Sequence, residues 1–215
     1  MAGRANIELQ DLDSIDQVYL YIGILGKEWE KAANPLNRYS TIRKGLSMQK
    51  LSPGYTFAQD IAEASPGKKI GLIVNAKGGT SISAWGPGSD FYNEAVKRTK
   101  QAMKSGVLKG VIWHQGESDA SKYETYTSKI IQLIKALRVE FNLPDLPFIA
   151  GQLSEDKESR IAFNQMIIEL PSLIEDVGVV TSDKTSTIDN THFDSASQRL
   201  LGRRYATEML KILNE

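Results

Sequence analysis

The chain has 215 residues, 41% of them hydrophobic, which suits a single domain with a sizeable core. Lys plus Arg and Asp plus Glu number 26 each, so no net field attracts nucleic acid or an anionic membrane. The absence of cysteine excludes disulfides, thiolate zinc sites and a cysteine nucleophile, and it suits an oxidising or a reducing compartment equally. No apolar run approaches the roughly 20 residues of a membrane span, and no signal peptide is visible, so the sequence assigns no compartment.

Strand-type and helix-type segments alternate along the chain. We expect, in order, a β-rich run at 18–22 continuing as a hairpin or meander to 31, a loop over 34–54, a helix at 55–64, a strand at 70–74, a helix at 90–104, a strand at 107–113, a helix at 123–141, a strand at 148–152, a helix at 159–170, a strand at 177–181 and a helix at 195–213. Asp90 is the expected N-cap of its helix. This alternation predicts an α/β fold with a mainly parallel sheet and helices on both faces.

Two of the expected strands, 70–74 and 107–113, are almost continuously apolar. Such runs are typical of parallel strands that are buried on both faces, because helices cover the sheet from each side. We therefore expect both strands to lie inside the molecule. No internal repeat or low-complexity linker interrupts the pattern, so we expect residues 1–215 to form one domain.

Polar loops follow three of the expected strands. They cover residues 75–81, residues 114–119 and the segment that leads to Asp189 and His192. In open parallel sheets the carboxyl ends of the strands form the ligand-binding rim. The three loops are therefore expected to converge on one site.

Gly78 and Gly79 have two interpretations. They could form a tight strand-to-helix turn, where glycine supplies a positive φ, or one of them could present its N–H to an oxyanion. The loop matches neither phosphate-binding glycine pattern, so nucleotide binding is not expected.

The cluster His114, Gln115, Glu117 and Asp119 is equally open to two interpretations: a solvated turn or part of a site. A metal site is a weak rival, because two histidines and no cysteine leave only carboxylates to complete it. Trp85 and Trp113 flank these loops. They could belong to the packed core, or they could form an apolar wall for a sugar ring.

Asp189 and His192 are separated by two residues, and His192 is one of only two histidines. An aspartate shortly before a histidine can hold the imidazole tautomer that accepts a nucleophile's proton. The same spacing also occurs in solvated turns and helix caps.

Three blocks carry a family resemblance: Asn75-Ala-Lys-Gly-Gly-Thr-Ser-Ile82, Trp113-His-Gln-Gly-Glu-Ser-Asp119 and Asp189-Asn-Thr-His-Phe-Asp194. Together they resemble the sialate O-acetylesterase domain, a group that includes carbohydrate esterase family 6 and acetylxylan-esterase-like proteins within the SGNH hydrolases. The resemblance runs through nearly the whole chain. It implies a flavodoxin-like, three-layer α/β/α fold and a Ser-His-Asp esterase that removes acetyl groups from carbohydrate hydroxyls without a cofactor or metal.

The resemblance also implies roles for individual residues. His192 would be the general base and Asp189 its orienting acid, while the Gly79 N–H and the Gln115 side-chain amide would form the oxyanion hole next to Gly78. Glu117 would brace the loop or a neighbouring donor. His114 would be a supporting or substrate-facing side chain.

The chain departs from the family pattern at its beginning. The family's nucleophile lies in a block similar to Gly-Gln-Ser-Asn-Met-Ala-Gly at the end of the first strand, and Met1-Ala2-Gly3 resembles the tail of that block. The sequence is therefore expected to be N-terminally incomplete and to lack the first strand and the nucleophile. Ser81, Ser83 and Ser118 lie where the family places no nucleophile.

Two functional hypotheses follow. The first is a carbohydrate O-acetylesterase whose serine lies outside the printed sequence, with an acetylated sugar as its partner. The second is a catalytically inactive homologue that binds carbohydrate or another protein through the same rim. A missing central strand leaves backbone groups unpaired, which favours a partner strand or a homo-oligomer.

Overall fold

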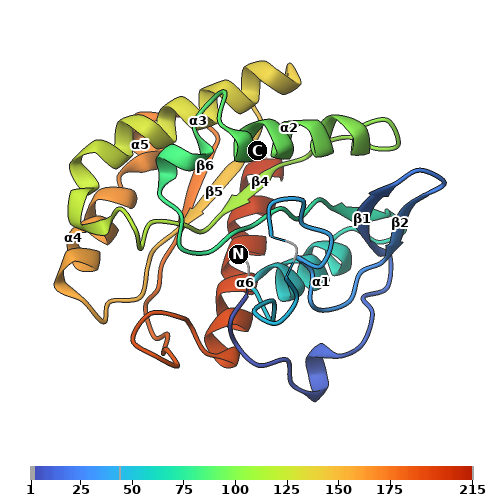
Figure 1. Ribbon diagram of the computed structural model, residues 1–215, viewed down its shortest axis with the longest axis horizontal. Coiled ribbons are helices and arrows are strands. Elements are labelled where there is room, and N and C mark those ends of the chain that lie inside the picture. Colours follow the sequence, from blue (N-terminus) through green and yellow to red (C-terminus); the bar gives the residue numbers. More distant parts are fainter. Residues whose placement is uncertain (1–2, 44, 215) are drawn as a thin grey trace.

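The computed structural model describes residues 3–43 and 45–214, arranged as alternating strands and helices (Figure 1). The elements are β1 (Val18–Ile24), β2 (Lys27–Lys31), α1 (Gly54–Glu63), β3 (Ile70–Leu72), α2 (Asp90–Ala102), β4 (Val111–Trp113), α3 (Tyr126–Phe141), β5 (Phe148–Gly151), α4 (Glu158–Ile167), α5 (Leu170–Leu173), β6 (Val177–Val180) and α6 (Ser195–Asn214). Short 3-10 helices occur at Leu9–Asp11, Ile82–Trp85 and Ala120–Thr125. Within this part of the chain, no helix combines the length and apolar character that a bilayer crossing needs.

The strands form two three-stranded sheets, in the orders β2-β1-β3 and β4-β5-β6. β1 pairs antiparallel with β2 and parallel with β3, and all pairs in the second sheet are parallel. Among the described residues, no backbone hydrogen bond joins β3 to β4. The predicted α/β fold with a mainly parallel sheet is confirmed, but its sheet is in two parts.

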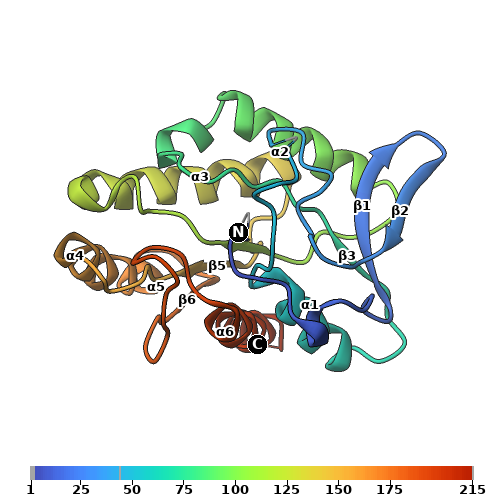
Figure 2. The same ribbon diagram turned by 60° about the horizontal axis from the view of Figure 1, so that its bottom comes forward.

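Helices cover both faces of these strands. Figure 2 shows α1 and α6 on one face and α2 and α3 on the other. Apolar side chains of α6 pack on Ile149 of β5 and Val180 of β6, while α2 and α3 enclose a cluster that includes Trp85 and Leu133. The helical layers therefore span both sheets and hold them in one structure.

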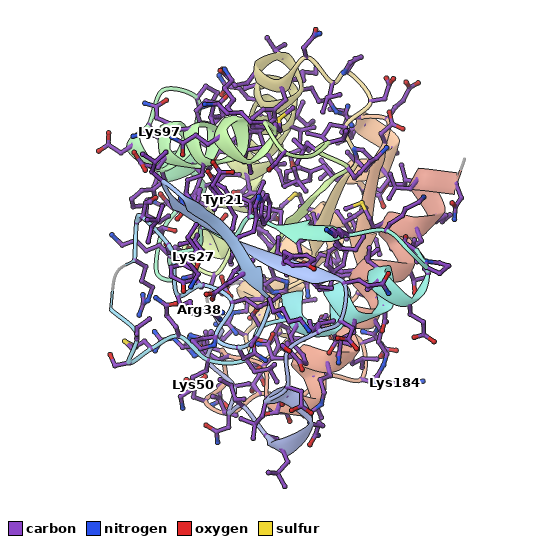
Figure 3. All side chains as sticks on the ribbon, turned by 90° about the vertical axis from the view of Figure 1, so that its right-hand side faces the viewer. Tyr21, Lys27, Arg38, Lys50, Lys97 and Lys184 are labelled. Atoms are coloured by element: carbon purple, nitrogen blue, oxygen red, sulfur yellow. The ribbon has the colours of Figure 1, made fainter. Side chains whose placement is uncertain are left out.

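The β1–β2 hairpin closes the side of the molecule opposite β6 (Figures 1 and 3). Tyr21 of β1 packs edge-on against Trp29 of β2, with ring centroids 5.0 Å apart. Arg98 of α2 donates a hydrogen bond of 3.0 Å to the Tyr21 carbonyl and lies over its ring. These contacts fasten the hairpin to the helical layer.

Three sequence expectations need correction. Ser89, not Asp90, is the N-cap of α2, because its hydroxyl accepts the Tyr92 N–H. The helix expected over 123–141 begins as a 3-10 helix and becomes α-helical only at Tyr126, since Lys122 has a non-helical backbone. The expected burial of the strands at 70–74 and 107–113 is confirmed for Leu72 of β3 but wrong for most of the other residues: Val111, Ile112 and Trp113 of β4 are only half-buried, and Val107 is exposed.

Candidate active site

His192 and Asp189 form a hydrogen-bonded pair on the turn before α6. The Nδ1 atom of His192 lies 2.7 Å from Oδ2 of Asp189, and the His192 backbone N–H donates to Oδ1 at 2.8 Å. These hydrogen bonds from His192 hold the pKa of Asp189 below its usual value. The carboxylate therefore stays ionised and fixes the ring with Nδ1 as donor. No described residue forms a hydrogen bond with Nε2.

Local backbone geometry brings the pair together. Asn190 adopts a left-handed conformation with φ of 57°, which asparagine tolerates better than most residues. The turn is closed by a bond from the Ile188 N–H to the His192 carbonyl at 2.8 Å and by a bridge between Thr187 and Phe193. Phe193 is buried and anchors the turn beside α6.

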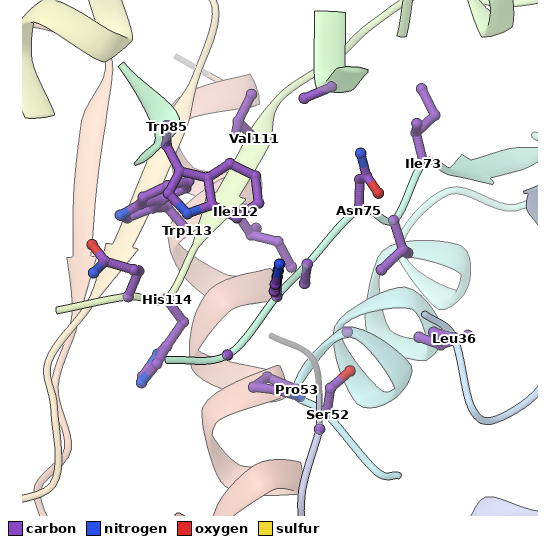
Figure 4. Close-up of a pocket in the computed structure, with 18 of the residues that line it drawn as sticks. Leu36, Ser52, Pro53, Ile73, Asn75, Trp85, Val111, Ile112, Trp113 and His114 are labelled. Carbon is purple, nitrogen blue, oxygen red and sulfur yellow. The ribbon is translucent and has the colours of Figure 1, made fainter. Parts of the chain in front are cut away.

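A pocket of about 470 Å³ separates β3 from β4 (Figure 4). Ile73 and Asn75 lie along one side of it, and Val111 to His114 lie along the other. Apolar side chains from both helical layers complete its walls: Phe57 of α1, Tyr92 of α2, and Leu133, Leu137 and Phe141 of α3. The pocket thus occupies the position where a strand between β3 and β4 would lie.

The rim of this pocket gathers the residues that the sequence singled out. Its lining includes Gly78, Gly79, His114, Gln115, Glu117 and His192, together with Gly3 and Arg4. Asp189 does not line the pocket, but it contacts His192. The expected convergence of the three polar loops is confirmed.

Gln115 is held by hydrogen bonds within the protein. Its amide nitrogen donates to the Thr80 carbonyl at 2.8 Å and to Oδ2 of Asp119 at 2.7 Å, and its amide oxygen accepts from the Tyr126 hydroxyl at 3.0 Å. Because an amide has only two N–H groups, both are engaged in this arrangement.

Asp119 joins the two glycine-bearing loops. Besides Gln115, its Oδ2 accepts the backbone N–H of Ile82 at 2.9 Å. The bracing role expected of Glu117 therefore falls to Asp119, since Glu117 is exposed and makes no hydrogen bond with a described residue. Gly116 permits the sharp turn between them: its φ is 154°, and a Cβ there would lie 2.4 Å from the Phe163 ring.

Gly79 leaves its backbone N–H open at the rim. Its φ is 72°, as expected of a glycine turn, and a Cβ there would meet no atom within 4 Å. Among the described residues, no acceptor is bonded to this N–H. Both interpretations of the glycine pair are thus compatible, because the turn that needs glycine also exposes a donor.

His114 is a neutral, shielded side chain. Its Nδ1 lies 2.9 Å from the Tyr205 hydroxyl, which donates its own proton to the Trp113 carbonyl at 2.9 Å. Nδ1 is therefore the protonated nitrogen, and Nε2 is a solvent-shielded acceptor without a partner among the described residues. Burial lowers the pKa of His114 to about 4.

The two flanking tryptophans belong to the packing of the rim. Trp85 is buried, lies edge-on to Trp113 with centroids 5.5 Å apart, and donates its indole N–H to the Thr80 hydroxyl. Trp113 donates to the Tyr126 hydroxyl at 3.0 Å. Both indoles also line the pocket and form part of its apolar wall.

No described hydroxyl group is hydrogen-bonded to His192 Nε2. Ser118 lines the pocket without such a bond, and the Ser83 hydroxyl accepts from Lys129 instead. Met1 and Ala2, which resemble the end of a nucleophile block, lie outside the described residues. Within the described part of the chain, no three His, Asp or Glu side chains are grouped as metal ligands.

The sequence does not reveal the roles of two structurally important residues, Asp119 and Arg160. Asp119 was seen as one of several polar residues, but its position between Ile82 and Gln115 depends on how two distant loops pack. Arg160, in the first turn of α4, donates to Asn190 and Thr191 within the His192 turn. Nothing in the sequence pattern distinguishes it from a surface arginine.

Comparisons with known proteins identify relatives of this chain. A family model described as carbohydrate esterase, sialic acid-specific acetylesterase, matches residues 1–211. An Arabidopsis thaliana protein named as a probable carbohydrate esterase is 32% identical over 195 residues, spanning 85% of this chain and 71% of that protein.

Solved structures extend the similarity to the fold. The X-ray structure of an Arabidopsis thaliana protein matches with a TM-score of 0.85 at 28% identity, covering 95% of this chain and 85% of that one. A carbohydrate acetylesterase from Xanthomonas citri shares the fold with a TM-score of 0.68 at 22% identity, covering 99% of this chain and 55% of that one. The chain therefore belongs to the sialic acid-specific acetylesterase family of carbohydrate esterases.

Proposed function

We propose that this protein is a carbohydrate O-acetylesterase in which His192 is the general base and Asp189 orients its ring. The observation that carries the proposal is the 2.7 Å bond between Nδ1 of His192 and Asp189, on a residue that lines the pocket. With Nδ1 protonated and held by the carboxylate, Nε2 keeps its lone pair to accept a proton.

The proposed reaction needs a serine next to Nε2. The serine oxygen attacks the acetyl carbonyl carbon while its proton passes to His192, and the Gly79 N–H donates to the oxyanion. His192 then gives that proton to the sugar oxygen as the ester bond breaks, which leaves an acetyl-serine. Water then attacks the acetyl carbon while His192 takes its proton; the serine oxygen leaves and receives that proton back, which releases acetate without a cofactor.

Gln115 is a second proposed oxyanion donor, with a condition. Its two N–H groups bond to Thr80 and Asp119, so one of these bonds must open when the oxyanion forms. If neither opens, the amide instead fixes the position of the Thr80 loop and thereby of the Gly79 N–H.

The pocket between β3 and β4 supports a specific source for the serine. Both strands present an unpaired edge to it, its walls are apolar, and Gly3 and Arg4 lie at its rim. We propose that an extended apolar segment, joined on the amino side of Gly3, occupies the pocket and carries the serine at its carboxyl end. Such a segment would satisfy the open backbone groups of both edges.

One observation favours a second function. Because no described hydroxyl is bonded to Nε2 of His192, the printed chain could bind acetylated carbohydrate at the rim without cleaving it. In that case the protein is a carbohydrate-binding or interaction module of an esterase family. Catalysis after addition of a serine segment distinguishes the two functions.

The test compares the printed chain with an extended version. In the extended protein, a strand-forming apolar segment ending in Gly-Gln-Ser-Asn directly precedes Met1, and a matched version carries Ala in place of that Ser. Hydrolysis of p-nitrophenyl acetate, acetylated xylo-oligosaccharides and O-acetylated sialic acid is measured for each. We expect activity only with the serine segment, and a loss of several orders of magnitude in its His192→Ala variant.

A matched control variant removes an aspartate charge that is not part of the Asp189–His192 pair. Asp183 is exposed and lies on the loop that follows β6, so Asp183→Asn is expected to leave the rate unchanged. A folded extended protein that binds acetylated sugar in calorimetry but releases no acetate would establish the binding function instead. A rate that survives His192→Ala would show that the base is assigned wrongly.

A further inference from the structure

Arg160 is a buried cation that reaches the turn carrying Asp189 and His192. It lies in the first turn of α4, with only 3% of its surface exposed. Its guanidinium donates to the Asn190 carbonyl at 3.0 Å, to the Thr191 hydroxyl at 3.0 Å and to the Ser154 hydroxyl at 2.6 Å. Asn190 and Thr191 are the two residues between Asp189 and His192.

The three acceptors of Arg160 are all neutral, as is the Tyr21 carbonyl that accepts from the similarly buried Arg98. Arg199, by comparison, pairs with the carboxylates of Glu8 and Asp11. Among the described residues, no carboxylate forms an ion pair with Arg160. Burying a charge without an opposite charge costs several kcal/mol, and its N–H groups must be satisfied by other acceptors. Arg160 is thus a costly residue, and two of its three hydrogen bonds end on one turn.

The turn needs such an anchor, because its working side chains have little packing of their own. The side chains of Asp189 and His192 are 51% and 36% exposed. The rigid fork of a guanidinium can fix two acceptors in one geometry, which a lysine ammonium cannot do. Holding Asn190 and Thr191 therefore fixes the distance between Asp189 and the His192 ring.

We infer that Arg160 is a positioning residue for the Asp189–His192 pair. The catalytic consequence rests on the proposed function, in which His192 is the base, but the positioning itself does not. It can be measured in the printed chain, because the pKa of Asp189 is low through its hydrogen bonds from His192. If Arg160 holds the pair together, removing its contacts raises that pKa toward the ordinary value of a free aspartate.

The experiment follows the carboxyl carbons of the aspartates by NMR during an acid titration. The proteins are the unaltered chain, Arg160→Lys, Arg160→Gln and Thr191→Val, which removes one acceptor and leaves the arginine in place. We expect the pKa of Asp189 to rise most in Arg160→Gln, less in Arg160→Lys and least in Thr191→Val.

Asp194 is an internal control in the same spectra. Its pKa is lowered by hydrogen bonds from Ser186 and Ser197, and no hydrogen bond or ion pair joins it to Arg160. Arg138→Gln is the matched arginine control, because Arg138 also donates to loop carbonyls, those of Leu146 and Glu175, away from the turn. Asp194 in the Arg160 variants and Asp189 in Arg138→Gln should keep their low pKa values.

The outcomes separate positioning from general stability. A rise of Asp189 alone supports the inference. A joint rise of Asp189 and Asp194 would show that Arg160 merely stabilises the local fold, and an unchanged Asp189 would show that it positions nothing. In the extended, active enzyme, Arg160→Lys should lower kcat more than it changes KM. If no extended protein shows activity, the proposed function is rejected, but the NMR result still decides whether Arg160 positions the pair.

Discussion

β5 and β4 are neighbours in one sheet with similarly apolar sequences, yet they lie in different surroundings. All four residues of β5 are buried, and the strand is paired on both edges, by β4 and β6. All three residues of β4 are half-buried, because its other edge faces the pocket. β3 lines the opposite side of the pocket, and among the described residues only β1 pairs with it. Strand burial thus depends on the neighbours present, not only on the strand's own residues.

The largest effect expected from this comparison concerns two isoleucines. Ile149 of β5 is fully buried in the core, and Ile149→Ala should lower the free energy of unfolding by about 3 kcal/mol through lost burial and a new cavity. Ile73 is half-buried at the pocket, so Ile73→Ala should cost less than about 1 kcal/mol. Urea unfolding followed by circular dichroism measures both.

The two isoleucine variants can also be compared in the extended protein. If an apolar strand fills the pocket, Ile73 becomes buried, and its replacement by Ala should approach the cost found at Ile149. Equal costs at the two positions in the printed chain would contradict the difference in burial between the two regions.

A second expected effect concerns His114 at the border between the buried sheet and the pocket. Its folded pKa of about 4 lies below the ordinary value of 6.5, so the unfolded chain binds the proton more readily between these values. The free energy of unfolding should therefore fall as the pH drops from 6.5 towards 4, by up to about 3 kcal/mol, and should gain nothing from this group above pH 6.5.

The His114 effect is isolated by a variant that does not titrate. His114→Phe removes the imidazole, so the difference in unfolding free energy between it and the unaltered chain should depend on pH in this range, whereas carboxylates contribute equally to both. NMR titration of the two histidines gives the pKa directly. A His114 pKa near 6.5 would show that solvent reaches Nε2 from the pocket.

Much of the fold follows from the sequence, for reasons these examples make clear. Apolar runs gave the strands at β3, β5 and β6, and helical spacing gave α1, α2, α3 and α6, because local periodicity is a property of each segment. Burial was predicted correctly for Leu72 but wrongly for the rest of β3 and for β4, since it depends on a neighbouring strand that no described residue supplies. The rim was predictable because chain topology alone brings the carboxyl ends of the strands together.

The individual bonds of the site were less accessible. The sequence identified His192, Asp189, Gln115 and Gly79 through a family pattern, but it could not show that Asp119 occupies the amide of Gln115. Nor could it show that Arg160 turns inward, because an arginine in the first turn of a helix is ordinarily solvated. Such contacts are fixed by the packing of segments far apart in the chain.

The last prediction concerns the free energy of unfolding after substitution of two glycines of the rim, Gly79 and Gly116. Gly79 lies in open space with φ of 72°, so Gly79→Ala should cost only the backbone strain, about 1 kcal/mol. Gly116 lies against the Phe163 ring, and Gly116→Ala adds overpacking, for a total of about 2–3 kcal/mol. Thermal and urea unfolding of both variants provide the measurement. A larger loss of stability at Gly79 than at Gly116 would mean that the open side of the pocket is more tightly packed than its wall.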